Sequence, residues 1–109
     1  MTMIADGRIV FVTVPTRETG LAIAQALVHE HLAACVNIIG PIESVYRWDA
    51  AVQHDSEFLL VIKTTAERYA GLEARIIALH PYQTPEVIAV SIAAGSAPYL
   101  EWIRSATTR

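Results

Sequence analysis

Residues 34–48 form a stretch that is too long, as a strand, to pair within a domain of this size. Apolar and β-branched residues dominate it, and Gly40-Pro41 in the middle predicts a bulge or bend. A polar turn region at 49–55 and a second apolar strand at 57–64 complete a hairpin. An arm of about 15 residues at about 3.3 Å each reaches about 50 Å, whereas a small domain is about 30 Å across. The far half of the hairpin therefore needs cover from a second chain.

Two further strands and three helices are predicted around this hairpin. The strands are the β-branched runs 9–14 and 86–92, and the helices cover 16–32, 64–79 and the residues from 96 onward. Thr16 and Ser96 are predicted N-caps, and Thr64 with Glu67 predicts a capping box. The order βαββαβα predicts an α+β, ferredoxin-like fold with an extended hairpin and a C-terminal helix, in a single domain over residues 1–109.

This topology predicts which residues meet. The fourth strand lies antiparallel to the first, so the segment from His80 to Glu86 is expected near Val12 and Thr13. Cys35 and Lys63 are expected next to each other across the hairpin, at the opposite end of the sheet.

The composition limits the partners. Apolar residues make up 53% of the chain and charged residues 17%, against about 45–50% and about 25% in typical domains, so part of the apolar surface is expected to face a partner subunit. A net charge of −3 without a basic run argues against nucleic acid. No apolar stretch is long enough for a membrane span. A single cysteine and an N-terminus unlike a signal peptide predict a soluble, cytoplasmic protein.

The rigid connector from His80 to Glu86 contains two prolines and is the first candidate site. His80 is a candidate metal ligand, with Glu86 or with symmetry copies as its partners. The alternative is a histidine at the end of a helix that interacts with the last carbonyls and the helix dipole. Glu86 either binds a cation or simply opens a strand.

A second set of candidates is expected to line a cleft between subunits. Cys35 is either a soft ligand or reactive thiol, or a small buried side chain. Lys63, the only lysine, either binds an anionic ligand or forms an ion pair with Glu57 or Glu67. The aromatic side chains of this set either line a pocket or pack in an interface: Tyr46, Trp48 and Tyr82.

Five short motifs occur in order along the chain: Ala33-Ala34-Cys35-Val36-Asn37-Ile38, Tyr46-Arg47-Trp48, Lys63-Thr64, His80-Pro81-Tyr82 with Pro85-Glu86, and Tyr99-Leu100 with Trp102-Ile103. Together they resemble the CutA divalent-cation tolerance family. The resemblance implies a ferredoxin-like homotrimer whose long hairpins pack between subunits, similar in shape to the trimeric PII signalling proteins. It also implies a copper site at the positions of Val12, Leu79 and His80, where the family has a cysteine and two histidines. Only His80 matches that set.

Three functional hypotheses follow. The first is a non-enzymatic, trimeric protein of the response to metal ions that binds Cu²⁺ or another divalent cation weakly near His80 and Glu86. The second is a PII-like signalling or scaffolding trimer that binds a small anionic ligand between subunits. The third is a purely structural assembly. No glycine-rich phosphate loop, zinc signature or serine-nucleophile motif points to an enzyme.

Overall fold

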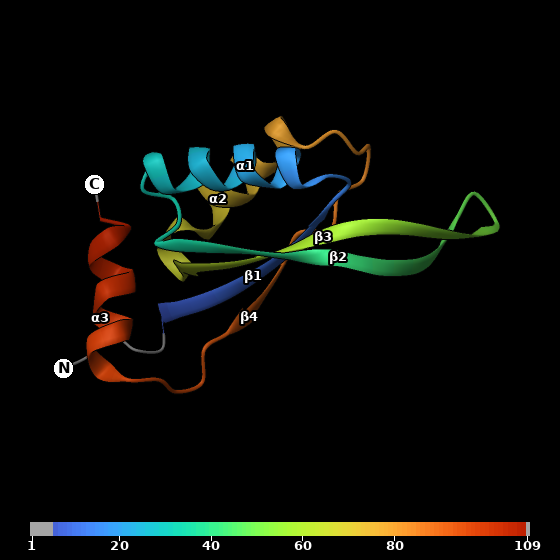
Figure 1. Cartoon of the computed structure of the whole chain (residues 1–109). Coiled ribbons are helices and arrows are strands. Elements are labelled where there is room, and N and C mark those ends of the chain that lie inside the picture. The colour runs from blue at the N-terminus through green and yellow to red at the C-terminus, as the bar shows by residue number, and fades with distance from the viewer. Residues whose placement is uncertain (1–5, 109) are drawn as a thin grey trace.

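A computed structural model describes residues 6–108, which form four strands and three helices (Figure 1). In chain order they are β1 (Gly7–Val14), α1 (Arg17–His29), β2 (Cys35–Trp48), β3 (Ala51–Thr65), α2 (Ala66–Leu79), β4 (Ile88–Ser91) and α3 (Ala97–Ala106). The predicted ferredoxin-like order with a C-terminal helix is confirmed. None of the described helices is long and apolar enough to cross a membrane.

All neighbouring strands are antiparallel, and their order in the sheet is β2-β3-β1-β4. Helices α1 and α2 lie on one face of this sheet, whereas α3 lies across one end (Figure 1). The core fills the space between the sheet and the first two helices. Its fully buried members include Val12 and Leu60 from the strands and Leu27, Leu72 and Ile76 from the helices.

The other face of the sheet is also apolar but has no helix over its middle. Alternation along the strands places Ile9 and Phe11 of β1 on this face, together with their register partners Val90 and Ile88 of β4. Ile88 is 54% exposed and Val90 47% exposed. We call this surface the open face; an uncovered apolar sheet surface is typical of a protein–protein interface.

The hairpin is longer than the sequence predicted. We expected a turn over 49–55 and a return strand from Glu57, but β3 already begins at Ala51 and the turn is Asp49-Ala50. Both turn residues have positive φ, 52° and 64°, as a two-residue hairpin turn requires. The predicted interruption of the first arm is confirmed as a register shift between Ile39 and Ile42. The described molecule is 50 Å long and 25 Å wide, because the hairpin extends well beyond the helices (Figure 1).

Two of the three predicted helix N-caps are confirmed, and one is wrong. Thr16 caps α1 by accepting a hydrogen bond from Thr19 N at 3.1 Å, and Ser96 caps α3. The capping box at Thr64 is wrong: Thr65 is the N-cap of α2, without a side-chain bond, and the Thr64 hydroxyl donates to Leu32 O at 2.8 Å. Helix α1 ends at His29 rather than near residue 32, and β4 is limited to four residues.

Candidate binding groove

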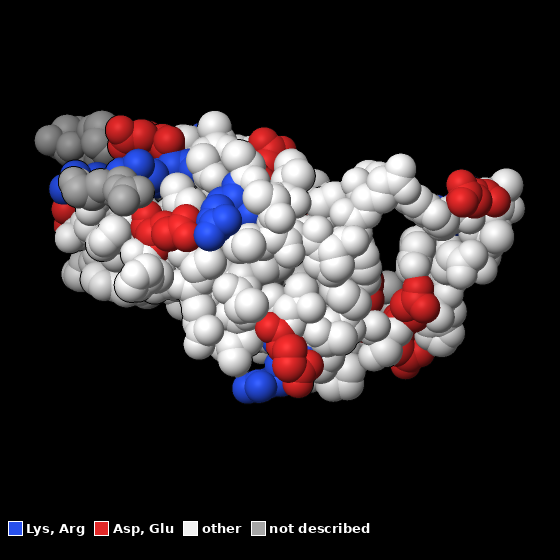
Figure 2. Space-filling view, turned by 90° about the horizontal axis from the view of Figure 1, so that it is seen from above, with Lys and Arg blue, Asp and Glu red and all other residues white. Residues whose placement is uncertain are grey.

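A groove of about 650 Å³ lies between the hairpin and the segment that joins α2 to β4. Figure 2 shows it as a hollow between the hairpin arm and the body of the molecule, with acidic side chains around it. Its lining residues come from β1, both hairpin strands and the connector: Thr13, Glu43, Ser44, Val45, Tyr46, Trp48, Glu57, Tyr82, Gln83, Thr84 and Glu86. The proximity that topology predicted, between the connector and the end of β1, is confirmed by a hydrogen bond from His80 to Thr13.

His80 anchors this connector through both of its ring nitrogens. Nε2 lies 2.8 Å from Thr13 O, and Nδ1 lies 3.1 Å from the backbone N of Tyr82. Because a carbonyl only accepts, Nε2 carries the proton and donates, and Nδ1 accepts from the Tyr82 N–H. The residue is 8% exposed. In this conformation neither nitrogen has a lone pair left for a metal, so a metal bound at His80 would have to displace the Tyr82 N–H.

Tyr82 reaches from the connector to the base of the hairpin. Its hydroxyl donates to Glu57 Oε2 at 2.6 Å, and its ring lies 4.7 Å from the His80 ring. Burial, then this hydrogen bond, and then the negative charge of Glu57 raise the pKa of Tyr82 above the ordinary value of 10. Tyr82 is therefore held as a neutral donor, and it fixes the connector to β3. The sequence suggested Glu57 only as an ion-pair partner of Lys63. In the structure Lys63 lies six residues further along β3 and donates to Asn37 instead.

Along the hairpin, polar side chains pair with each other. The Tyr46 hydroxyl donates to Asp55, and this bond is the main reason why the pKa of Tyr46 is raised. His54 and Glu43 form an exposed pair at 2.8 Å. These contacts explain why a polar sequence continues the strand instead of forming a wide turn, since cross-strand pairs stabilise a hairpin.

The charges around the groove have one sign. Three carboxylates line it, those of Glu43, Glu57 and Glu86, and its lining residues include no lysine or arginine. These carboxylates are nevertheless spread out. Within residues 6–108, no three His, Cys, Asp or Glu side chains lie close enough together to hold a metal ion. The groove favours cations over anions, and residues 6–108 form no preformed metal centre.

Cys35 and Lys63 lie at the other end of the sheet. They are register partners across the hairpin, as predicted, and Lys63 Nζ donates to Asn37 Oδ1. The Cys35 Sγ also lies 3.9 Å from this oxygen. Asn37 was not singled out in the sequence; the signal was a polar residue within the apolar run 34–39. In one copy, therefore, Cys35 and Lys63 do not join the groove that contains Trp48 and Tyr82.

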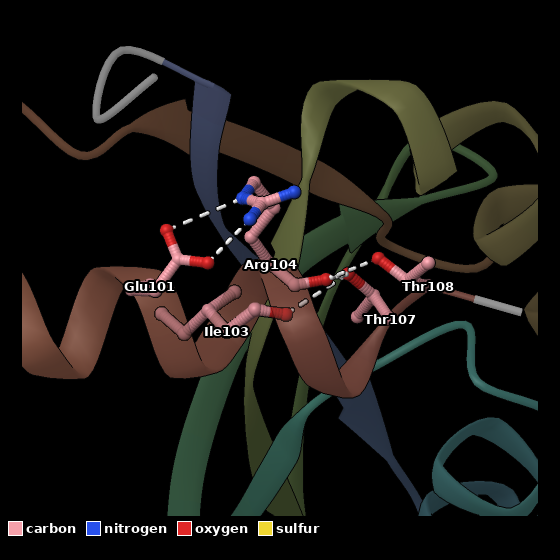
Figure 3. Close-up of polar contacts among 5 residues, drawn as sticks. All are labelled: Glu101, Ile103, Arg104, Thr107 and Thr108. Atoms are coloured by element: carbon pink, nitrogen blue, oxygen red, sulfur yellow. Dashed lines mark hydrogen bonds and ion pairs between the residues drawn. The ribbon is translucent and has the colours of Figure 1, made fainter. Parts of the chain in front are cut away.

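Helix α3 borders this second region. Burial, and then the proximity of Cys35, raises the pKa of Tyr99 on this helix. Figure 3 shows how the helix ends: the hydroxyls of Thr107 and Thr108 donate to the carbonyls of Ile103 and Arg104, and Arg104 pairs with Glu101. Arg68 of α2 donates to Thr107 O at 2.6 Å. The helix is thus tied to α2 and closes this end of the sheet.

Known proteins share both the sequence and the fold. The family described as CutA1 divalent ion tolerance protein matches residues 8–106. A divalent-cation tolerance protein CutA from Thermus thermophilus is 48% identical over 99 residues, which cover 91% of this chain and 96% of that protein. The chloroplastic protein CutA of Arabidopsis thaliana is 52% identical, but this chain spans only 54% of its length. A solved structure of the divalent cation tolerance protein from Thermus thermophilus superposes with a TM-score of 0.92 at 47% identity, covering 94% of this chain and 99% of that one. The chain therefore belongs to the CutA1 divalent ion tolerance protein family.

Proposed function

We propose that this protein is a non-enzymatic divalent-cation tolerance protein that works as a homotrimer and binds divalent cations, Cu²⁺ among them, weakly in the groove. The observation that carries this proposal is the charge of the groove: three carboxylates and no lysine or arginine among its lining residues. Family membership supports the same role. The expectation that the protein acts in the cytoplasm stays a prediction.

The proposed ligands differ from those expected in the sequence. His80 uses both nitrogens to hold the connector, so Glu86, which is exposed in the groove, is the proposed first ligand. Because the groove carboxylates are spread out, water molecules complete the coordination at Glu86. Oxygen ligands suit hard cations, whereas the general order of divalent affinities still places Cu²⁺ above Mn²⁺. A site of this kind is weak and exchangeable.

Two features support assembly with further copies. The open face exposes Ile39, Ile88 and Val90, and the hairpin extends beyond any cover from its own helices. The number three comes from the resemblance to CutA proteins. Because Cys35 and Lys63 lie at the opposite end of the sheet from Trp48 and Tyr82, the predicted cleft that joins all four residues requires a second copy.

The alternative function, a PII-like trimer that binds a small anionic ligand, has weaker support. The only lysine, Lys63, donates to Asn37 and is absent from the lining of the groove. An anion in the groove would face carboxylates at short range, which is unfavourable.

Calorimetric titration with Cu²⁺ and Mn²⁺ tests the cation proposal. We expect weak binding of both, tighter for Cu²⁺, and a loss of at least fivefold in affinity for Glu86→Gln. Glu18→Gln, an exposed charge change on α1 that is not part of the groove lining, is the matched control. Identical isotherms for Glu86→Gln and the wild type would refute the role of Glu86. Absence of binding to either metal would refute the function.

Sedimentation tests the assembly. We expect the wild type to sediment as a trimer and Ile88→Lys, which places a charge on the open face, to shift it toward smaller species. Ile77→Lys is the control, because Ile77 is about equally exposed, at 53%, but lies on α2. A well-folded wild-type monomer at micromolar concentration contradicts the proposed homotrimer.

A further inference from the structure

His80 joins the connector to the sheet through an uncharged imidazole ring. The ring lies between a carbonyl and an amide: Nε2 is 2.8 Å from Thr13 O, and Nδ1 is 3.1 Å from the backbone N of Tyr82. A carbonyl can only accept a hydrogen bond, and an amide N–H can only donate one. The two contacts together therefore fix the tautomer with its proton on Nε2 and require a neutral ring.

The bond at Nδ1 is the attachment of the connector's backbone. The N–H of His80 itself donates to Ile76 O at 2.8 Å, and Pro81 has no N–H, so Tyr82 supplies the first amide donor after α2. Within residues 6–108, no backbone N–H of residues 82–86 donates to a backbone carbonyl. Without an acceptor at Nδ1, the Tyr82 hydroxyl, which donates to Glu57, would be left to hold this segment to the sheet.

Protonation of the ring removes this acceptor. Histidine is the side chain whose charge ordinarily changes between about pH 5 and 8. The second proton enters at Nδ1, where it meets the N–H of Tyr82, so a hydrogen bond becomes a contact between two donors. The bond from Nε2 to Thr13 O is kept, and it becomes stronger because its donor is now charged. The ring therefore stays on β1 while the backbone of Tyr82 loses its partner.

The other groups around the ring do not oppose its positive charge. From β1 comes the carbonyl of Thr13, and α2 ends at the ring with its last carbonyls, which form the negative end of the helix dipole. From β3, the carboxylate of Glu57 approaches through the hydroxyl of Tyr82, whose ring lies 4.7 Å from that of His80. Glu86, further along the connector, is also acidic. Among these groups only the N–H of Tyr82 repels a protonated ring.

We propose that His80 is an acid-sensitive latch, which holds the connector while its ring is neutral and releases the backbone of residues 81–85 when its ring is protonated. This segment carries Gln83 and Thr84, which line the groove, so release changes the wall of the groove. The latch consists of protein groups alone, and His80 is not the ligand proposed for the cation. It therefore operates whether or not a cation is bound.

NMR of the full-length protein in metal-free buffer tests the latch. Nitrogen-15 spectra of the imidazole ring show which nitrogen carries the proton, and we expect Nε2 at pH 8. Between pH 8 and pH 5, the protection of the Tyr82 amide, relative to exchange in an unstructured peptide, should fall about tenfold in step with the charging of the ring. A proton on Nδ1 at pH 8, a ring that stays neutral down to pH 5, or unchanged protection on charging would overturn the proposal.

Two substitutions separate the roles of the two nitrogens. His80→Asn keeps an acceptor for the Tyr82 N–H, because an asparagine side chain accepts from the amide two residues further on, but it does not titrate. The acid-induced loss of protection should therefore disappear in this variant, although every carboxylate is still present. His80→Gln has no acceptor at the position of Nδ1, so its Tyr82 amide should be weakly protected at every pH.

His29→Gln is the matched control, because it removes an exposed histidine from the last turn of α1 and should respond to acid as the wild type does. If His80→Asn also responds as the wild type does, the response belongs to the carboxylates and the latch is refuted. The wild-type tautomer and titration decide the question even where a variant does not fold. Cation binding is measured separately, so its failure would affect the proposed function and not the latch.

Discussion

Replacing Tyr82 with Phe removes one oxygen atom and tests how the connector is held to the sheet. The Tyr82 hydroxyl donates to Glu57 at 2.6 Å, and Glu57 is almost completely buried. A hydrogen bond to a charged group contributes about 1.5–3 kcal/mol. Tyr82 is 37% exposed, so water screens part of this interaction and the lower end of the range applies. We expect Tyr82→Phe to lower the free energy of unfolding by about 1–2 kcal/mol at pH 7.

The same bond predicts a dependence on alkaline pH. Burial and the bond to Glu57 raise the pKa of Tyr82 above its unfolded value of 10. A group whose pKa is raised in the folded state contributes fully below the unfolded pKa, and its contribution is lost as the pH rises through the folded pKa. The stability of the wild type should therefore fall above about pH 10, and the difference from Tyr82→Phe should shrink there.

Denaturant unfolding at pH 7 and at pH 9–12, at one fixed protein concentration, measures both effects. Tyr46→Phe is the matched control, because Tyr46 also donates to a carboxylate, that of Asp55, but on the exposed hairpin. We expect no measurable change for it at pH 7. If Tyr82→Phe destabilises the protein no more than Tyr46→Phe, or keeps the wild-type alkaline profile, the connector is not held by this bond.

Two further predictions concern the hairpin. Ala50→Gly should stabilise the protein by about 0.5–1 kcal/mol, because Ala50 has φ 64° and glycine adopts this conformation without steric cost; a thermal melt that shows no gain would contradict this. Gly40→Ala should cost about 1–3 kcal/mol, because its Cβ would lie 2.5 Å from Phe58 Cδ2. Gly71→Ala in α2 is the control: its Cβ would lie 3.3 Å from the Leu32 side chain, and the substitution should be neutral or stabilising. If Gly40→Ala and Gly71→Ala change the stability equally, the clash with Phe58 is excluded.

Local features of the sequence were sufficient for most of the fold. The caps at Thr16 and Ser96 depend on residues three positions away, and they were predicted correctly. The apolar runs identified all four strands, and their order allowed one simple topology. This topology in turn predicted that Cys35 meets Lys63 and that the connector meets the end of β1, because register follows from strand direction.

Two of the failures arose because side chains bond to partners outside the local sequence pattern. Thr64 looked like an N-cap, but its hydroxyl binds Leu32 O, 32 residues away. The turn was predicted over residues 49–55, yet residues 51–55 pair with the opposite arm through contacts such as that of Tyr46 with Asp55.

The candidate site shows the same division. The order of residues and strands was enough to predict which chemical groups the connector carries and which end of the sheet it occupies. The folded chain was needed to show that both His80 nitrogens are used and that Tyr82 donates to Glu57. It also decided that Glu57 is buried without a cation from residues 6–108. The physical reason is that hydrogen bonds and burial depend on side-chain positions brought together from β1, β3 and the connector, and no local pattern encodes these positions.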